Sequence, residues 1–271
     1  MTLPQQTPSA ADRSPVTGTG VIKSVDKVLD ILEYLAGARR PVGVSEVARA
    51  VNFHVSTAHR LLRTLASRGY VEQEAVLRQY VLGPRLLALS GAYRGGEMLV
   101  QVARPELERL RDSIGETIHL GVYRNGQVIE IASASSRQPV SVTMGTGFQD
   151  PAHCSALGKV LLAHLPQESL AALLAAGPLE RRTARSITRK PDLLRALDAV
   201  RGQGFAIDEE ELASDLCCIA VPVADASGQV VAALSVAMPK SRFRSGSIRR
   251  WTLALTESAV RIGERLMAGG G

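Results

Sequence analysis

Aromatic residues and cysteines are both rare in this chain of 271 residues, and each shortage excludes a class of protein. Phe, Trp and Tyr together make up 4% of the sequence. A platform for single-stranded nucleic acid stacks bases on aromatic side chains, so we do not expect one here. The cysteines are Cys154, Cys217 and Cys218, an odd number with two of them adjacent. That pattern is no disulfide framework, and it indicates a reducing compartment.

The sequence also lacks a long uninterrupted apolar run, so it predicts no transmembrane helix. Residues 1–19 have no basic start followed by an apolar core, and so do not resemble a secretion signal. They are rich in Pro, Thr, Ser and Gln, and we expect them to form a disordered arm. With the cysteine pattern, these features favour a cytoplasmic location.

Recognisable motifs for catalysis, metals and nucleotides are missing as well. The five histidines are scattered without the spacing of metal ligands, and no P-loop surrounds Gly158 and Lys159. His153 beside Cys154 could indicate a thiolate activated by histidine, but neighbouring residues rarely have that geometry and no orienting carboxylate follows nearby. We therefore expect no enzyme activity, no metal site and no cofactor.

The length is enough for one large domain or two ordinary ones, and a break in the pattern favours two. A hydrophobic content of 45% is enough for real cores, and the adjacent Gly95 and Gly96 separate two different patterns. We predict a disordered arm over residues 1–19, a first domain over 20–83, a linker helix over 84–96 and a second domain over 97–268.

The stretch from residue 44 to residue 82 has the element order of a winged helix-turn-helix, a DNA-binding module. A helix over residues 24–35 precedes it. The apolar spacing then predicts a short helix, capped by Ser45, followed by a turn, a second helix and a two-stranded hairpin. In that order, these elements are residues 45–51, 52–54, 55–67, 70–73 and 79–82.

The second of these helices has an apolar stripe and an opposite polar face. Hydroxyls at its start and arginines behind them suit the major groove, where small residues approach bases and phosphates and arginines reach guanine edges or the backbone. The residues that we expect to contact DNA are Ser56, Thr57, His59, Arg60 and Arg63 on the helix and Arg78 near the hairpin tip.

The charge distribution supports this interpretation. Residues 20–95 contain eleven Lys and Arg residues against six Asp and Glu residues, a net of +5, whereas the whole chain has a formal net charge of +6. Neutralisation of phosphates by Lys and Arg is the main sequence-independent source of DNA affinity. The alternative is that the polar helix face is only solvated, as many such faces are.

The second domain mixes antiparallel strands with helices, which favours an α+β fold with one sheet. Asn125 and Gly126 are a strong hairpin signal between neighbouring strands. A further strand is predicted over residues 140–144. The other predicted strands are residues 117–123, 127–132, 205–208, 217–223 and 230–237. The predicted helices are residues 99–113, 156–164, 168–176, 191–201 and 247–267.

The acidic run of this domain leaves two alternatives open, and the adjacent cysteines allow a prediction about the strand that they begin. The acidic run at residues 208–211 is either a solvated loop, as such runs usually are, or a loop beside a sheet that supplies polar groups to a small-ligand pocket. Cys217 and Cys218 begin an apolar strand, and strand alternation places their side chains on opposite faces.

Several stretches in the right order resemble the IclR family of bacterial transcription regulators, over about residues 21–267. In the first domain the resemblance rests on SVDKVLDIL, STAHRLLRTLASRGYVEQ and YVLGPRLLALS. In the second it rests on HCSALGKVLLAHL and GFAIDEEELASDLCCIAVPVADASGQVVAALSV. The family signature is matched at Gly204, Asp208, Glu211, Cys218, Ile219, Ala220, Val223 and Asp225. Ala224 departs from it, because the family usually has an aromatic residue there.

The resemblance implies an N-terminal winged helix-turn-helix and a C-terminal effector-binding domain with a GAF/profilin-like fold. It also implies a homodimer through the N-terminal regions, and often a dimer of dimers. Family effectors are typically small carboxylates or aromatic catabolites. Carried over by position, the effector-binding residues are Ala156, Leu157, Asp208, Cys218 and Ser235. Ala237 stands where a second serine is often found, which favours a larger and less polar organic acid.

A carboxylate ligand at these positions would need hydrogen-bond donors. Backbone N–H groups at the helix start over residues 156–158, the Ser235 hydroxyl and the Cys218 thiol could supply them. Asp208 would repel a carboxylate unless it is protonated or turned towards a ligand hydroxyl, so it favours a ligand that also carries a donor group.

Taken together, the sequence predicts a ligand-responsive transcription regulator that binds double-stranded operator DNA. Its target would be a catabolic operon for a small organic acid or aromatic compound, and no membrane partner is expected. Two alternatives remain: an enzyme of small organic acids with an appended DNA-binding domain, and a DNA-binding protein without a ligand.

Overall fold

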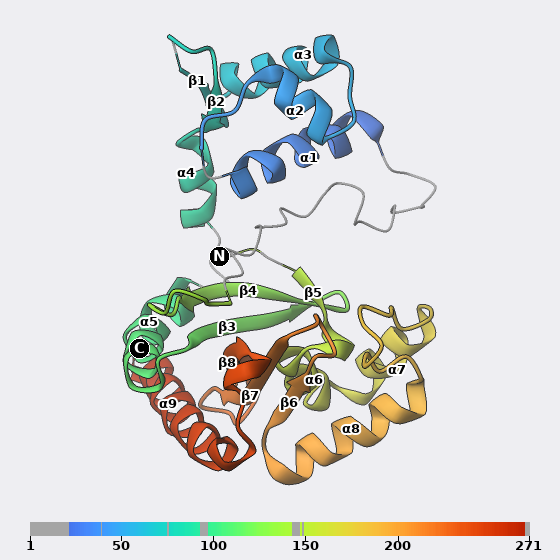
Figure 1. Ribbon diagram of the computed structural model, residues 1–271, viewed down its shortest axis with the longest axis vertical. Helices are drawn as coiled ribbons and strands as arrows, with labels where there is room; N and C mark the ends of the chain where they lie inside the picture. The colour runs from blue at the N-terminus through green and yellow to red at the C-terminus, as the bar shows by residue number, and fades with distance from the viewer. Residues whose placement is uncertain are drawn as a thin grey trace. The chain divides into compact units, whose positions relative to one another are not determined.

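The computed structural model describes residues 22–38, 40–74, 76–92, 97–142, 147 and 149–268. The chain divides into two compact units, Met1–Arg94 and Gly95–Gly271, and each unit has its own hydrophobic core (Figure 1). The disordered arm predicted over residues 1–19 lies outside the described residues.

The first unit packs helices around a small antiparallel hairpin. In chain order its elements are α1 (Lys23–Ala38), α2 (Val44–Ala50), α3 (Val55–Ser67), β1 (Val71–Gln73), β2 (Tyr80–Leu82) and α4 (Arg85–Ala92). Strands β1 and β2 pair with Glu72 opposite Val81, and Val42 adds an isolated bridge to Tyr80. This order confirms the predicted winged helix-turn-helix.

The core of the first unit is built from one apolar side of each helix. Ile31 of α1, Val47 of α2, Leu62 of α3 and Tyr80 of β2 are all at most 1% exposed. Burial of a leucine side chain stabilises a fold by about 1.5–3 kcal/mol. Because the buried positions of α3 recur every three or four residues, the opposite side of that helix is left facing solvent.

Helix α2 begins one residue earlier than the sequence predicts. Gly43 is its N-cap, with an extended backbone, and the Gly43 carbonyl accepts hydrogen bonds from the N–H groups of Glu46 and Val47 at 3.0 Å. The prediction that Ser45 caps this helix is therefore wrong. Ser45 already lies in the first turn and its side chain is exposed.

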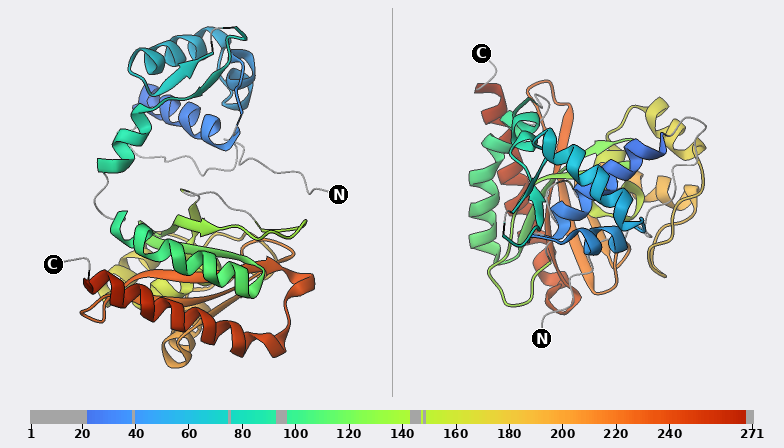
Figure 2. Two further views of the ribbon diagram at one scale, coloured as in Figure 1. Left: turned by 90° about the vertical axis from the view of Figure 1, so that its left-hand side faces the viewer. Right: turned by 90° about the horizontal axis from the view of Figure 1, so that it is seen from above.

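The second unit is a six-stranded antiparallel sheet in the order β5-β4-β3-β8-β7-β6 (Figures 1 and 2). Its strands are β3 (Thr117–Arg124), β4 (Gln127–Ala134), β5 (Gln149–Pro151), β6 (Ala206–Glu209), β7 (Leu216–Ala224) and β8 (Val230–Pro239). One face is covered by α5 (Glu97–Ile114) and α9 (Ile248–Ala268). The other is covered by α6 (Ala156–Ala163), α7 (Gln167–Ala175) and α8 (Lys190–Gln203). This arrangement confirms the predicted α+β class.

The two faces of the sheet enclose separate hydrophobic cores. Cys217 lies in the core under α5 and α9, whereas Cys218 lies in the core under α6 and α8. The predicted alternation of these two side chains is therefore confirmed. It places Cys218, and not Cys217, on the face that holds the predicted effector-binding residues.

One strand prediction fails. Residues 140–142 form no strand, and residues 143 and 144 lie outside the described part of the chain. Val140 is 46% exposed, and its carbonyl accepts a hydrogen bond from Arg242 at 2.9 Å instead of joining a ladder. The strand beside β4 is β5, where Asp150 pairs with Val128.

Within the described ranges, no helix is long and apolar enough to cross a membrane. Nor do three or more His, Cys, Asp or Glu residues gather there in a way that could hold a metal ion.

Candidate DNA-contacting surface and effector site

Helix α3 presents the predicted DNA-contacting residues on its outer side. Ser56, Arg60 and Arg63 are exposed, while Thr57 and His59 are half-buried. The inner side packs Ala58, Leu62 and Leu65 into the core. Packing on one side only holds the helix firmly while leaving the arginine side chains free to reach a partner.

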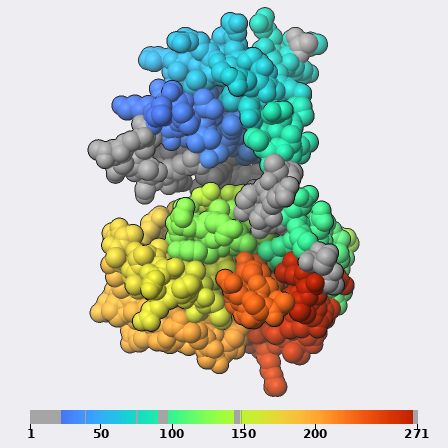
Figure 3. Space-filling view, turned by 180° about the vertical axis from the view of Figure 1, so that it is seen from behind, coloured from blue at the N-terminus to red at the C-terminus, as the bar shows by residue number. Residues whose placement is uncertain are grey.

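Arg78 lies in the turn between β1 and β2. Its backbone has a φ of 52°, in the left-handed region, and its N–H donates to the Glu74 carbonyl at 3.0 Å. Its own carbonyl accepts a hydrogen bond from the Gln73 side chain at 3.2 Å. These bonds hold the turn, and the Arg78 side chain is exposed. Strand β1 contacts α3. Figure 3 shows the surface of the first unit from behind, in blue to blue-green.

The predicted effector-binding residues of the sheet lie on one face and in neighbouring rows. Asp208 of β6 is opposite Cys218 of β7, which is opposite Ala237 of β8. One row along, Ser235 of β8 pairs with Ala220 on one side and with His119 of β3 on the other. Directly opposite residues have Cβ atoms about 4.5–5.5 Å apart, so these side chains form one continuous patch.

Helix α6 lies over this patch, with its first turn fully buried. The Ser155 side chain caps it by accepting a hydrogen bond from Gly158 N–H at 3.1 Å. The N–H of Gly158 is therefore already used, contrary to the expectation that residues 156–158 all offer donors. The N–H groups of Ala156 and Leu157 belong to the first turn, where an α-helix has no internal acceptor.

Gly158 sets how closely α6 approaches the preceding segment. A Cβ atom added there would collide with the backbone of Ala152. Leu157 packs on Gly121 of β3, where an added Cβ would lie 3.1 Å from the Leu157 Cδ1 atom. Gly121 thus lets Leu157 lie close to the sheet, while Gly158 lets the helix start lie close to the segment at Ala152.

Asp208 is completely buried, and only one of its two carboxyl oxygens has a hydrogen-bond partner among the described residues. Its Oδ1 accepts hydrogen bonds from the N–H groups of Glu211 at 2.7 Å and Leu212 at 3.4 Å, while Oδ2 has no partner among the described residues. Burial raises the pKa of Asp208 to about 7, and the nearby Glu211 carboxylate adds to the rise. Asp208 is therefore close to half protonated at neutral pH, and can either donate to a ligand or accept from one.

The acidic run is not a solvated loop throughout. Lys159 of α6 forms an ion pair with Glu211, and its ammonium also donates to the Ile207 carbonyl at 2.5 Å. The Ser186 hydroxyl donates to the Glu211 carbonyl at 2.7 Å. These bonds tie the acidic loop to α6 and to the segment before α8, while Glu209 remains exposed.

The sequence reasoning missed a buried pair on the same face. The Nδ1 atom of His119 lies 2.8 Å from Oε2 of Glu130, and His119 Nε2 and Glu130 Oε1 have no partner in the described ranges. The hairpin signal at Asn125 and Gly126 could have revealed it, because counting back from that turn places Glu130 opposite Gly121, on the face that carries His119.

Asp150 of β5 is a third buried carboxyl group near this pair. Burial raises its pKa to about 7, and the charges of Arg182 and His119 oppose that rise. The sheet face under α6 therefore holds three carboxyl groups, Asp208, Glu130 and Asp150, each at most 7% exposed.

The thiols on this face are poor nucleophiles. Burial raises the pKa of Cys154 to about 12, and it raises that of Cys218 well above its ordinary value. Both are therefore neutral at physiological pH, whereas a nucleophilic cysteine needs a thiolate. Cys154 donates to the Pro151 carbonyl at 3.6 Å, and the ring of His153 instead meets the Glu180 carbonyl at 2.8 Å.

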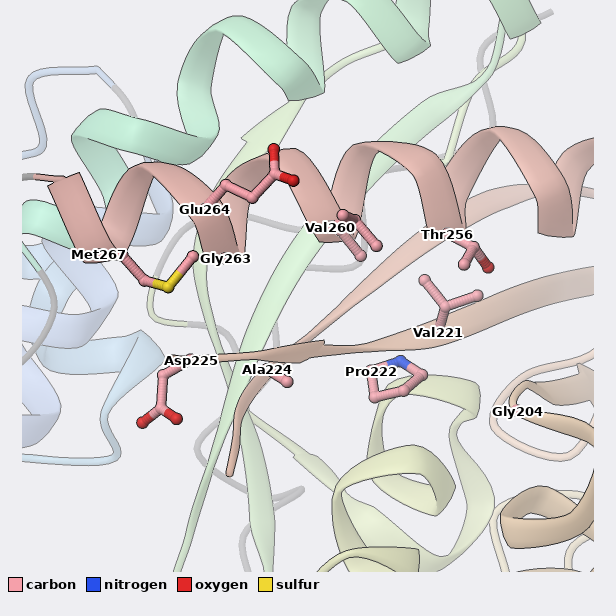
Figure 4. A pocket seen from close by; sticks show the side chains of 11 residues that line it. Gly204, Val221, Pro222, Ala224, Asp225, Thr256, Val260, Gly263, Glu264 and Met267 are labelled. Atoms are coloured by element: carbon pink, nitrogen blue, oxygen red, sulfur yellow. The ribbon is translucent and has the colours of Figure 1, made fainter. Parts of the chain in front are cut away.

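A surface hollow of about 410 Å³ lies elsewhere in this unit, between α9 and β7 (Figure 4). It is lined mainly by apolar groups, including Val221, Val260 and Met267, and the acidic residues Asp225 and Glu264 line it as well. None of the predicted effector-binding residues lines it.

A winged helix-turn-helix joined to an α+β domain with buried polar groups defines a class: a DNA-binding transcription regulator with a separate effector-binding domain. Comparisons with known proteins assign the family. The description "Bacterial transcriptional regulator IclR C-terminal" matches residues 92–264, and "IclR helix-turn-helix domain" matches residues 24–75. The chain belongs to the IclR family, which confirms the resemblance seen in the sequence.

Individual relatives agree with this assignment. The chain is 34% identical over 245 residues to the HTH-type transcriptional regulator KdgR of Escherichia coli (strain K12), covering 90% of this chain and 93% of that protein. The crystal structure of the Thermotoga maritima IclR matches with a TM-score of 0.73 and 27% identity, covering 90% of this chain and 98% of that one.

A second solved structure contains a ligand. It is an IclR homolog from Microbacterium hydrocarbonoxydans complexed with 4-hydroxybenzoate, with a TM-score of 0.74 and 28% identity. The match covers 91% of this chain and all of that chain.

Proposed function

We propose that this protein is a ligand-responsive regulator of a catabolic operon for a small organic acid or aromatic compound, and that it acts without catalysis. The observation that carries the proposal is the buried polar patch under α6, where Asp208 Oδ2 has no hydrogen-bond partner among the residues that the structure describes. A buried polar atom without a hydrogen bond costs about 1–3 kcal/mol, so a ligand that supplies the missing partner gains affinity there.

The chemistry of the patch favours a ligand with two different polar groups. The Ala156 and Leu157 N–H groups and the Ser235 hydroxyl can hold a carboxylate. Asp208, whose Oδ2 has no partner within the described part of the chain, suits a hydroxyl group on the same ligand. 4-Hydroxybenzoate, the ligand of the Microbacterium homolog, has one carboxylate and one hydroxyl and so exemplifies this class of compound.

The first unit supports binding of operator DNA as a homodimer. Val25 and Leu29 lie on one side of α1, and Ile22 immediately precedes the helix; these three residues are 53%, 49% and 65% exposed. Leu87 of α4 is 76% exposed. An apolar side of this size on a small unit suits a partner copy, and a dimer would present two α3 helices to a pseudo-palindromic site. A dimer of dimers would extend the same arrangement, and the DNA target implies that the protein acts in the cytoplasm.

Regulation requires that the effector distinguish two states of the protein. A ligand shifts the equilibrium only by its difference in affinity for the two states. We propose that filling the patch under α6 favours one placement of the two DNA-binding units over the other.

Binding to the DNA upstream of the protein's own gene tests this proposal, with a scrambled duplex of the same length as the control. Selective binding is expected, and 4-hydroxybenzoate and other hydroxylated carboxylic acids should then raise the melting temperature and change the operator affinity. Turnover of such a compound would favour the enzyme alternative. Selective DNA binding without any response to these acids would favour the ligand-free alternative.

A further inference from the structure

A groove of about 370 Å³ lies between α1 and α3 of the first unit. Three cationic side chains line it: Lys23 and Lys27 from α1 and Arg60 from α3. Three hydroxyl side chains line it as well, those of Ser24, Thr57 and Thr64, together with Leu61. The two lysines lie outside the set of residues that the sequence predicts to contact DNA.

No carboxylate lines this groove in the part of the chain that the structure describes. The Lys27 ammonium lies 4.7 Å from the centre of the Phe53 ring, which holds it beside the start of α3. The Thr64 hydroxyl donates to the Arg60 carbonyl at 3.0 Å and so belongs to the helix itself. The three like charges that line this groove repel each other, and an anion bound between them would relieve that repulsion.

The position of the groove on α3 indicates which anion it suits. Thr57, Arg60 and Thr64 recur every three or four residues along the side of α3 that faces α1. Each of these residues is preceded in the chain by one on the neighbouring side of α3. Those preceding residues are Ser56, His59 and Arg63. A helix of 10–12 Å diameter nearly fills a major groove about 12 Å wide, so the DNA backbone passes along the flank of the helix.

The apolar side of α1 does not compete for this groove. Val25 and Leu29, which the proposal above assigns to the dimer contact together with the preceding Ile22, lie on a different side of α1 from Lys23 and Lys27, because successive helix positions are rotated by about 100°. A partner copy on that side therefore leaves the groove open to DNA.

We propose that the groove between α1 and α3 binds a phosphate of the operator backbone through Lys23, Lys27 and Arg60. This inference rests on the proposed operator binding and adds α1 to the DNA interface. The contact positions the first unit on the duplex without reading bases, because a phosphate carries no direct sequence information.

The test is the double variant Lys23→Ala/Lys27→Ala in the full-length protein, compared with wild type over a salt series on the operator duplex. Each phosphate contact contributes about 0.9 to the slope of log affinity against log salt. We expect the slope to become shallower by about 0.9 per DNA-binding unit and the affinity for the operator to fall. The ratio of the affinities for the operator and the scrambled duplex should stay unchanged. The variant Lys23→Arg/Lys27→Arg, which keeps both charges, should retain the wild-type slope.

Lys190→Ala is the matched control, since Lys190 is an exposed lysine at the start of α8 in the other unit. An unchanged slope and affinity in the double alanine variant would overturn the inference while leaving operator binding intact. A loss of operator preference with an unchanged slope would also overturn it, because the lysines would then act on base recognition or on the fold. Absence of operator preference in the wild type would instead refute the proposed function.

A second measurement separates DNA phosphate from free phosphate. Inorganic phosphate is titrated into the DNA-free protein at constant ionic strength by calorimetry. The inference expects no saturable binding in the millimolar range. Saturable binding that the double alanine variant loses, together with an unchanged salt slope on DNA, would reassign the groove to a free anion.

Discussion

His119 and Glu130 form a buried pair, with 2.8 Å between Nδ1 of the imidazole and Oε2 of the carboxylate. Both side chains are at most 3% exposed, and each keeps one polar atom, Nε2 and Oε1, without a partner among the described residues. The hydrogen bond between Nδ1 and the Glu130 carboxyl group orients the imidazole ring, so that Nε2 lies on the side of the ring away from Glu130. The pair thus extends the polar patch beyond the residues carried over from the family.

Replacing Glu130 tests the strength of this pair. Glu130→Gln keeps the shape of the side chain but removes the charge, and hydrogen bonds to charged groups are stronger than neutral ones. We expect the free energy of unfolding, measured by urea denaturation, to fall by about 1–2 kcal/mol. Glu108→Gln, on the exposed side of α5, should leave it unchanged. Equal stability of the two variants would mean that the charge of Glu130 contributes nothing to the fold.

Asp208 should make the stability depend on pH. Its folded pKa of about 7 lies above the ordinary value of 3.8, so between these pH values the native state keeps a proton that the unfolded chain loses. The native state then binds more protons, and the contribution of Asp208 to stability falls as pH rises through this window and is constant above it.

Asp208→Asn has no proton to lose, so its stability relative to wild type should improve from pH 4 to pH 7, on the order of 1–4 kcal/mol. Chemical denaturation at several pH values measures this difference. The exposed residue Asp198 supplies the control substitution, Asp198→Asn, which should show no such trend. A pH-independent difference between wild type and Asp208→Asn would show that Asp208 is ionised throughout.

Ser235 should contribute to effector binding without supporting the fold. Ser235→Ala removes one donor from the patch, and a hydrogen bond to a charged group is worth about 1.5–3 kcal/mol. We expect affinity for a carboxylate effector to fall by about tenfold or more, measured by calorimetry or by the ligand-induced rise in melting temperature. Ser169→Ala on the exposed side of α7 is the control. An unchanged response would remove Ser235 from the binding site.

Gly158 should be indispensable for the position of α6. In Gly158→Ala the new Cβ meets the backbone of Ala152, which cannot move as a flexible side-chain end could. We expect a loss of roughly 1–3 kcal/mol in stability from overpacking, together with weaker effector binding. Gly246→Ala is the matched control, since an added Cβ there contacts nothing within 4 Å. If both variants melt at the same temperature, the close approach of α6 to Ala152 is not required for the stability of the fold.

Arg63 should act only through DNA. Its side chain is exposed on α3, so Arg63→Ala should leave the melting temperature and the oligomeric state unchanged. Loss of a bidentate base contact costs about 1–3 kcal/mol, or roughly tenfold to a hundredfold in operator affinity per contact. Fluorescence anisotropy with labelled operator measures the operator affinity of this variant. Arg195→Ala, at an exposed position in α8, is the control. Retained operator affinity would exclude Arg63 from the interface.

The elements of the fold were largely predictable from local patterns. Helix α3 has the predicted bounds, residues 55–67, because its apolar spacing is strongly helical and Gly69, with φ 74°, follows its end. The hairpin predicted at Asn125 and Gly126 is also present, where it joins β3 to β4. Of the strand predicted over residues 140–144, residues 140–142 form no strand, because an apolar stretch becomes a strand only where a neighbouring strand offers a ladder; the strand that pairs with this edge of β4 is β5.

The sequence by itself determined the winged helix-turn-helix, the α+β class, the family and the opposite faces of Cys217 and Cys218. Only the tertiary structure decided which members of the acidic run are buried, that His119 pairs with Glu130, and that Lys23 and Lys27 share a groove with Arg60. The periodicity of apolar residues along a chain shows which side of a single helix or strand is apolar. Burial, pKa shifts and convergent charges depend on which distant segments meet, and that is set by packing between elements.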